Sequence, residues 1–372
     1  MRHMIRITIL VVVFLFTAGH GFFVVAQNDR EYSGKAREGL EHAMEFNLKP
    51  SYIIPTHGFY NGWNPQGKPL RVGGTADVRY SFSQAGRGVY QGVGIAVHTF
   101  GSHQMLGTPT TVYIFQGAPL ALLTERLSIG YEWNLGLSAG WKNNEVVTVS
   151  PLNIYINVAA LFTWRVTDSW DVVFGPEYTH FSNGDTRFPN GGVNTVNFRI
   201  GARRRFSPAT EIHTEKIFAS SNLLARRMTY DLILYGGWRA DRSTSGGHLE
   251  IINKPFPVAG LNFNPLYHFN SYLSAGAALD LMYDRSANSD RDDFLSHVAV
   301  GLSARTELEM PIFAVNLGLG YNLFHKGQDL EGLYGMFSLK AFLGSRLFLN
   351  VGYRLGAVNY SHNLMFGFGW RF

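Results

Sequence analysis

The sequence predicts an all-β fold, a transmembrane antiparallel β-barrel of about 12–14 strands that forms a single domain after a cleaved signal peptide. Three observations support this prediction. Many segments of about 10 residues alternate between apolar and polar side chains, as do strands with lipid on one side and a lumen on the other. The chain contains 41 Gly, 28 Phe and 18 Tyr. Its last segment puts Phe366, Phe368, Trp370 and Phe372 on one face, and aromatic side chains favour the membrane–water interface.

The first residues have the pattern of a secretory signal peptide. Arg2 and Arg6 precede an apolar run, and the small residue Ala26 precedes a cleavage point at Gln27. We therefore expect three parts, namely a signal peptide at 1–26, a periplasmic leader at 27–44 and an outer-membrane barrel at 45–372. The chain has no Cys, which excludes disulfides, thiol catalysis and thiolate metal sites.

Charge and hydropathy narrow the functional classes. The formal net charge is +5, and loss of Arg2 and Arg6 with the signal peptide would leave a mild excess that does not indicate nucleic-acid binding. No later apolar run approaches about 18 residues, so no membrane-spanning helix is expected. A soluble β-sandwich is the competing fold. The signal peptide, the aromatic excess and the alternating last segment favour the membrane barrel.

Segments with the length and alternation of membrane strands follow one another along the chain, separated by turn-like clusters. They are 70–82, 90–100, 127–138, 153–164, 171–182, 193–205, 229–239, 258–267, 272–283, 294–307, 313–324, 333–342, 347–355 and 363–372. A further strand or a periplasmic excursion is possible at 110–123, and 206–228 is long enough for a short helix. Short and long connections alternate, and short turns belong in the periplasm. If the last strand runs towards the periplasm, the hairpin loop 183–192 is extracellular.

Two polar residues interrupt an apolar strand face near this loop. Side chains two apart on a strand share a face, and the even positions of 171–182 are apolar until His180 and Ser182. On the next strand Asn194 begins the apolar face. We therefore expect these three residues together on the lipid-facing surface near the outer rim, and Glu177 on the lumen face. Polar groups are costly in lipid and are usually functional there.

These residue types suit ester hydrolysis. A serine becomes a nucleophile when a base such as histidine takes its proton, and a third group orients the imidazole. The side chain of Asn183 and the backbone N–H of Gly184 are candidate donors to an oxyanion. The alternative interpretation is an Asn- and Gly-rich extracellular hairpin whose His and Ser lie at the interface without a chemical role.

The same segment resembles a known family. Residues 178–184 read Tyr-Thr-His-Phe-Ser-Asn-Gly and residues 189–194 read Pro-Asn-Gly-Gly-Val-Asn. This pattern resembles the signature of the lipid A 3-O-deacylases, the PagL-like acyloxyacyl hydrolases of outer-membrane barrels. Residues 279–284 and 150–157 are similar to longer, Bacteroidetes-type members. The motif covers about 15 residues, and the weaker barrel resemblance covers most of the mature chain.

The resemblance implies roles for the site residues. It makes His180 the general base and Ser182 the nucleophile, and it places Asn183 at the oxyanion hole, with Gly184 and Asn190 in support. The family has Glu where this chain has Asn194. An amide cannot carry the charge that stabilises an imidazolium, although its oxygen can accept from the ring. A His–Ser dyad assisted by Asn194, a changed substrate and lost activity all remain open.

The sequence thus predicts a carboxylic ester hydrolase that removes an ester-linked acyl chain from lipid A. The implied location is the outer membrane of a Gram-negative bacterium. The implied partners are lipopolysaccharide in the outer leaflet and, during biogenesis, the barrel-assembly machinery, with the protein a monomer or weak dimer. No cofactor or metal is implied, and an acidic loop at 284–293 is the weak calcium candidate. A catalytically silent structural barrel and a solute-conducting, porin-like barrel are the alternative functions.

Overall fold

The computed structural model describes most of the chain after residue 39. The described residues are 40–84, 90–143, 147, 150–184, 186–206, 228–245, 248–269, 273–287, 292–309, 313–326, 330, 332–343, 346–356 and 362–372. The expected signal peptide, the first part of the expected leader and nearly all of 206–228 lie outside them. Within the described residues, no helix has the length and apolarity needed to cross a membrane.

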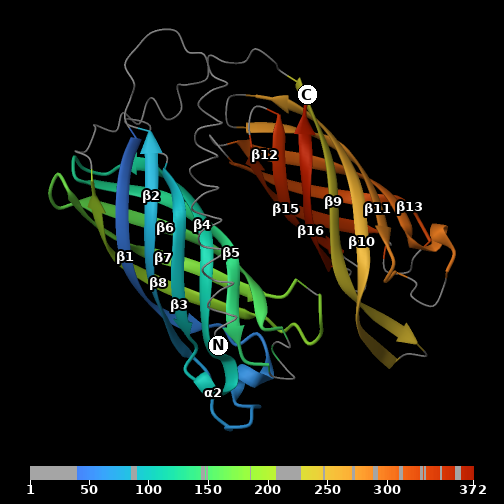
Figure 1. Cartoon of the computed structure of the whole chain (residues 1–372), viewed down its shortest axis with the longest axis horizontal. Coiled ribbons are helices and arrows are strands. Elements are labelled where there is room, and N and C mark those ends of the chain that lie inside the picture. The colour runs from blue at the N-terminus through green and yellow to red at the C-terminus, as the bar shows by residue number, and fades with distance from the viewer. Residues whose placement is uncertain are drawn as a thin grey trace. The chain divides into compact units, whose positions relative to one another are not determined.

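The first eight strands form one closed barrel, which we call barrel 1 (blue to green in Figure 1). Neighbouring strands pair antiparallel, and β8 pairs with β1 so that Ala202 lies opposite Phe46. Closure leaves the sheet without a free edge. The strands are β1 (Leu40–Ile53), β2 (Val72–Gln84), β3 (Tyr90–Thr99), β4 (Gly107–Leu122), β5 (Leu127–Trp141), β6 (Leu152–Arg165), β7 (Trp170–Ser182) and β8 (Val193–Arg205). Two short helices, η1 (Gly58–Asn61) and α2 (His103–Leu106), lie in the connections.

The remaining eight strands close separately as barrel 2 (yellow to red in Figure 1). Here β16 pairs with β9, with Phe368 opposite Leu234. The strands are β9 (Met228–Ser245), β10 (His248–His268), β11 (Leu273–Asp284), β12 (Val298–Glu309), β13 (Phe313–His325), β14 (Leu333–Phe342), β15 (Leu347–Gly356) and β16 (His362–Arg371). A short helix, η2 (Phe294–His297), precedes β12.

The expected class, an antiparallel all-β barrel, is confirmed, but its organisation differs from the prediction. The described residues form 16 strands rather than 12–14, and these strands form two closed barrels rather than a single one. The strand suggested at 110–123 exists as β4. The residues 40–44, expected in the leader, begin β1. Which strands pair to close a barrel is a long-range property that local alternation does not encode.

Each strand alternates between the lumen and the outer surface. On β7 the odd-numbered residues from Asp171 to Phe181 are buried, and the even-numbered ones are half-buried or exposed. The outer surface of β8 carries Val196, Phe198 and Ile200, all exposed. An apolar outer face over a polar inner face is the arrangement of a membrane-spanning barrel.

Ion pairs fill the middle of barrel 1. Each of four buried carboxylates meets a base, and the shortest pairs are Lys49–Asp77 at 2.6 Å, Arg79–Glu132 at 2.6 Å, Arg199–Glu177 at 2.6 Å and Arg203–Glu45 at 2.7 Å. Eight strands enclose a space just wide enough for side chains. The balanced charges explain how so many ionised groups are buried together.

An aromatic cluster fills barrel 1 on one side of this network. Trp141 and Phe181 meet with ring centres 5.1 Å apart, and His98 lies 5.0 Å from Phe181. The ring nitrogens of His98 bond to Thr75 and Thr111, each at 2.8 Å. The lumen is therefore packed with side chains at this level as well.

Barrel 2 has its own charged interior. Asp231 accepts from Lys340 and Arg371, each at 2.7 Å, and Asp280 accepts from Arg305 at 2.6 Å. Tyr334 also donates to Asp280. This lumen too is crossed by side chains that bond to one another.

Connections of different length lie at opposite ends of barrel 1. The turns at 123–126 and 166–169 are short and share an end with the start of β1 and the end of β8. The connections at 54–71 and 183–192 are longer and lie at the other end. Outer-membrane barrels keep short turns in the periplasm and long loops outside, so we assign the end with the long connections to the extracellular side.

Candidate active site

The candidate site lies on the outer surface of barrel 1, where β7 and β8 approach their connecting loop. His180 and Ser182 face outward and are half-buried. The strand register puts His180 directly opposite Asn194, which also faces outward. Phe181, between His180 and Ser182, points inward to the aromatic cluster. Packing on the lumen side thus holds two polar side chains on the lipid side, as the alternation predicts.

Three side chains form a continuous hydrogen-bonded chain. The Oγ of Ser182 lies 2.9 Å from Nε2 of His180, and the Nδ1 of His180 lies 2.7 Å from Oδ1 of Asn194. An amide oxygen can only accept, so in this arrangement Nδ1 carries the ring proton. Nε2 is then unprotonated and accepts from the serine hydroxyl, which is the tautomer that a general base requires.

Tyr178 adds a contact to which the sequence interpretation gave no role. Its hydroxyl donates to the same Oδ1 of Asn194 at 2.7 Å, and its side chain is 41% exposed on the outer surface. Two donors therefore converge on one amide oxygen. Tyr178 has the same strand parity as His180, which is the sequence signal that could have identified it.

Asn190 ties the loop that follows Ser182. The backbone N–H of Asn183 donates to Oδ1 of Asn190 at 3.0 Å. The Asn183 side chain is only 4% exposed. Gly184 has a φ of 66°, a left-handed conformation that suits glycine. The structure thus places all three expected support residues in the loop after Ser182, with Asn190 bonded to the main chain next to the nucleophile.

Gly192 lies close against the two outward-facing side chains and the main chain between them. Its φ is 63°, and a Cβ there would lie 3.0 Å from the carbonyl oxygen of Phe181, 3.5 Å from Cε1 of His180 and 4.0 Å from Cβ of Ser182. Any side chain would press on the Phe181 carbonyl and occupy the volume next to His180 and Ser182. This glycine stands in the sequence motif, but its role depends on a backbone angle that the motif does not show.

The η1 connection supports the site hairpin from the neighbouring strand. The buried Tyr60 hydroxyl donates to the carbonyl oxygen of Gly192, and the N–H of Ile54 donates to the carbonyl oxygen of Asn194 at 2.8 Å. Burial raises the pKa of Tyr60, so its phenol remains a donor through the neutral range. These bonds link residues more than 130 positions apart, which explains why sequence inspection missed them.

Glu177 is not part of this arrangement. It is buried on the lumen face, where Arg199 approaches to 2.6 Å and Lys49 to 3.2 Å. The lumen-facing position that strand parity predicts for Glu177 is confirmed. Asn194 is the side chain that bonds to Nδ1 of His180.

The depth of the site in the membrane follows from strand geometry. Between Trp170 at one end of β7 and His180 there are ten residue steps, or about 33 Å along the strand. A tilt of about 40° reduces this to about 25 Å along the membrane normal, the height of the apolar band of such barrels. His180 and Ser182 therefore lie at the edge of the apolar band.

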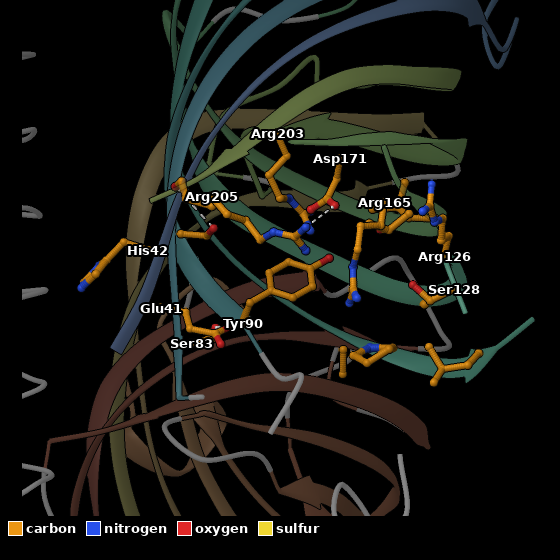
Figure 2. A pocket seen from close by; sticks show the side chains of 18 of the residues that line it. Glu41, His42, Ser83, Tyr90, Arg126, Ser128, Arg165, Asp171, Arg203 and Arg205 are labelled. Carbon is orange, nitrogen blue, oxygen red and sulfur yellow. Dashed lines mark hydrogen bonds and ion pairs between the residues drawn. The ribbon is translucent and has the colours of Figure 1, made fainter. Parts of the chain in front are cut away.

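A cavity of barrel 1 lies away from these residues. A space of about 130 Å³ opens near the short turns, lined by Tyr90, Asp171, Arg203 and Arg205 among others (Figure 2). Arg205 approaches Asp171 to 3.1 Å across it. None of the site residues lines this cavity.

Metal ligands are not gathered anywhere in the described part of the chain, where no three His, Asp or Glu side chains form a candidate cluster. In the loop considered for calcium, Asp284 accepts from Ser286 at 2.5 Å and Asp292 pairs with Arg285 at 2.9 Å. The described carboxylates of this loop are thus turned to separate partners.

Comparison with known proteins first defines the class. The closed barrels with apolar outer faces are outer-membrane β-barrels of the kind found in Gram-negative bacteria. Residues 228–372, which span barrel 2, match the family described as acyloxyacyl hydrolase, C-terminal domain. The PagL-like resemblance expected from the sequence is thus supported by a family match over residues 228–372. The dyad of β7 and β8 lies outside the matched residues.

Other comparisons concern the whole chain. No curated protein sequence matches it. Similar solved structures include the Neisserial surface protein A, with 10% identity and a TM-score of 0.32 over 45% of this chain and 99% of that one. The Acinetobacter baumannii outer membrane protein Omp33 has 10% identity and a TM-score of 0.17 over 90% and 99% of the two chains. These values carry no argument about function.

Proposed function

We propose that the protein is an outer-membrane esterase that removes an ester-linked acyl chain from lipid A. The observation that carries the proposal is the chain of bonds from Ser182 through His180 to Asn194, located on the outer surface at the edge of the apolar band. Ester bonds of membrane lipids lie at this boundary between acyl chains and head groups. The C-terminal acyloxyacyl hydrolase domain supports the reaction class.

The reaction follows from the geometry of the dyad. The Oγ of Ser182 attacks the ester carbonyl carbon while its proton passes to Nε2 of His180. The tetrahedral intermediate then expels the sugar alkoxide, which takes the proton from His180, and the acyl group stays on Ser182. Water attacks this acyl-enzyme, again giving a proton to His180. Release of the fatty acid returns that proton to Ser182.

Asn194 assists this cycle without supplying charge. Its oxygen accepts from Nδ1 and holds the ring in the reactive tautomer. A carboxylate in this place also stabilises the imidazolium, and replacement of such a carboxylate by an amide costs about 10⁴ in kcat in serine proteases. We therefore expect slow turnover. Asn183, which the sequence resemblance assigns to the oxyanion side, has its backbone N–H held by the Oδ1 of Asn190.

Substrate reaches this site from the lipid phase. The dyad faces outward, and the lumen of barrel 1 is filled by ion pairs and aromatic rings. A packed lumen also disfavours the solute-conducting alternative. A catalytically silent barrel is the second candidate, and the amide of Asn194 is the observation in its favour.

Lipid A composition tests the proposal. Cells that express the native protein should lose one acyl chain from lipid A, measured by mass spectrometry, and cells that express Ser182→Ala should not. Heat-dependent migration on gels would verify that both proteins fold as barrels. Unchanged lipid A with a folded native protein would refute the deacylase proposal for that substrate and leave the silent barrel.

A further inference from the structure

Residues 54–71 connect β1 to β2, and we call them the η1 loop. The loop carries positively charged side chains and no acidic side chain that would balance them. It contains Lys68 and Arg71 and no Asp or Glu. Lys68 is exposed. Arg71 donates to the carbonyl oxygen of Tyr60 at 3.0 Å and to the amide oxygen of Asn61. Because both acceptors are neutral, they hold the guanidinium in place and leave its charge unbalanced.

This loop is fixed next to the candidate site. Tyr60 bonds to Gly192, beside the dyad, and the backbone N–H of Ile53 donates to the carbonyl of Arg71 at 2.8 Å. Ile53 pairs in turn with Thr195 on β8. Neighbouring strands are about 4.8 Å apart, so the main chain of Arg71 lies about 10 Å across the sheet from the β8 residues of the site.

The loop also presents an aromatic side chain suited to the interface. Trp63 is 83% exposed, and its ring covers Gly58 so closely that a Cβ there would lie 2.7 Å from Cε3. A tryptophan held at the rim of a membrane barrel partitions to the level of the head groups. Cations combined with an exposed Trp are the features of a surface that binds an anionic interface.

We propose that the η1 loop binds the phosphorylated head group of the lipid whose ester reaches Ser182. Lys68 and Arg71 contact phosphoryl oxygens, for which guanidinium and ammonium groups are well suited, and Trp63 contacts the adjoining apolar part. The inference rests on the proposed function for its substrate, but it concerns binding and makes a separate prediction. The loop selects anionic lipids and plays no part in bond cleavage.

Binding without hydrolysis tests this assignment. The full-length Ser182→Ala protein in detergent is titrated calorimetrically with diphosphorylated lipid A and with the same glycolipid lacking phosphates. The diphosphorylated form should bind more tightly, and Lys68→Gln should weaken its binding by about tenfold, the value of one charge-assisted bond. Binding of the phosphate-free form should not change. Arg71→Lys, which keeps the charge, should retain most of the affinity.

A matched control uses Lys142, an exposed lysine at the same end of barrel 1 but in the connection between β5 and β6. Lys142→Gln should bind diphosphorylated lipid A as the parent does. If Lys68→Gln and Lys142→Gln lost the same affinity for diphosphorylated lipid A, binding would depend on the general surface charge of the barrel. That result would overturn the assignment. Equal binding of the two glycolipids would also overturn it.

Two further outcomes distinguish this inference from the proposed esterase function on which it rests. Inorganic phosphate at millimolar concentration should not displace the lipid, and efficient displacement would mean a free-anion site instead of a lipid head-group site. Phosphate-dependent binding in a protein that never hydrolyses lipid A would leave the binding surface intact and refute only the proposed reaction.

Discussion

Tyr178 and His180 donate to one and the same atom, the Oδ1 of Asn194, each at 2.7 Å. This shared acceptor decides how the proposed esterase works without a carboxylate. A glutamate would both orient the imidazole and stabilise the positive charge of the imidazolium, whereas an amide only orients the ring. An amide can also rotate and present its NH₂ group to the ring, which would stabilise the unreactive tautomer.

Restoring the charge is the most direct test of this arrangement. Asn194→Glu should raise kcat by tenfold or more, because a carboxylate stabilises the imidazolium that forms as Ser182 attacks. Asn194→Gln is the matched control, since it has the same length without the charge, and it should not exceed the native rate. Hydrolysis of a short-chain chromogenic ester by purified protein measures both. If Asn194→Glu gave no gain in kcat, the absence of a negative charge at residue 194 would not be what limits the rate of the reaction.

Removal of the Tyr178 hydroxyl should lower activity through Asn194. Tyr178→Phe deletes one of two donors that favour the oxygen-inward orientation, and we expect a three- to tenfold loss in kcat, or about 1 kcal/mol. A carboxylate has no wrong orientation, so the loss should shrink in the Asn194→Glu background. The four proteins form a double-mutant cycle. Equal losses in both backgrounds would contradict a role through Asn194.

The site could be predicted from the sequence where it depends on strand parity. Parity put His180, Ser182 and Asn194 outward and Glu177 inward, as the structure has them. Contacts between distant segments, such as Tyr60 with Gly192, have no local signature. Strand parity did not clearly predict β4. Its inward residues Tyr113 and Phe115 belong to the aromatic cluster, so this strand does not alternate between apolar and polar side chains.

The number of barrels could not be predicted in the same way. Strand β1 alternates well, with Glu45 and Asn47 inside and Phe46 and Leu48 outside. The sequence nevertheless predicts a leader up to residue 44, because nothing local shows that the partner of β1 is β8, about 150 residues later. Alternation gives the face of each residue, but only pairing determines where a sheet closes.

Space beside the dyad should be essential for activity. Gly192→Ala would place a methyl group 3.0 Å from the carbonyl oxygen of Phe181 and next to His180 and Ser182. It would fill the space beside the dyad or shift the main chain that carries it, and we expect at least a tenfold loss in kcat/KM on a short-chain ester. The left-handed backbone adds a stability cost of about 1–2 kcal/mol. Gly67→Ala is the matched control, because its φ is also 63° and nothing lies within 4 Å of its Cβ position. Similar activity losses in both variants would point to backbone strain instead of blocked space.

Tyr60 should make the stability of barrel 1 depend on pH at the alkaline end. Its pKa is raised by burial, so the folded state holds the phenol proton more tightly than the unfolded state does. The associated stability is complete below about pH 10, the unfolded value, and is lost as pH rises beyond it. Thermal unfolding followed by circular dichroism should show a steeper alkaline decline for the native protein than for Tyr60→Phe. Parallel declines would mean that other groups govern it.

The buried ion pairs in the lumen of barrel 1 should contribute to the stability of the protein but not to its catalytic rate. Glu177→Ala would leave Arg199 and Lys49 buried without the carboxylate that both contact. We expect this to lower the free energy of unfolding by about 3–5 kcal/mol. Glu125→Ala, in an exposed turn, is the control and should cost almost nothing. Urea midpoints in detergent compare the two. Folded Glu177→Ala protein should retain the native rate on a short-chain ester, because Glu177 lies on the opposite face of β7 from Ser182. A large loss of activity at unchanged stability would instead place Glu177 in the catalytic machinery and contradict the assignment of Asn194 as the group that orients His180.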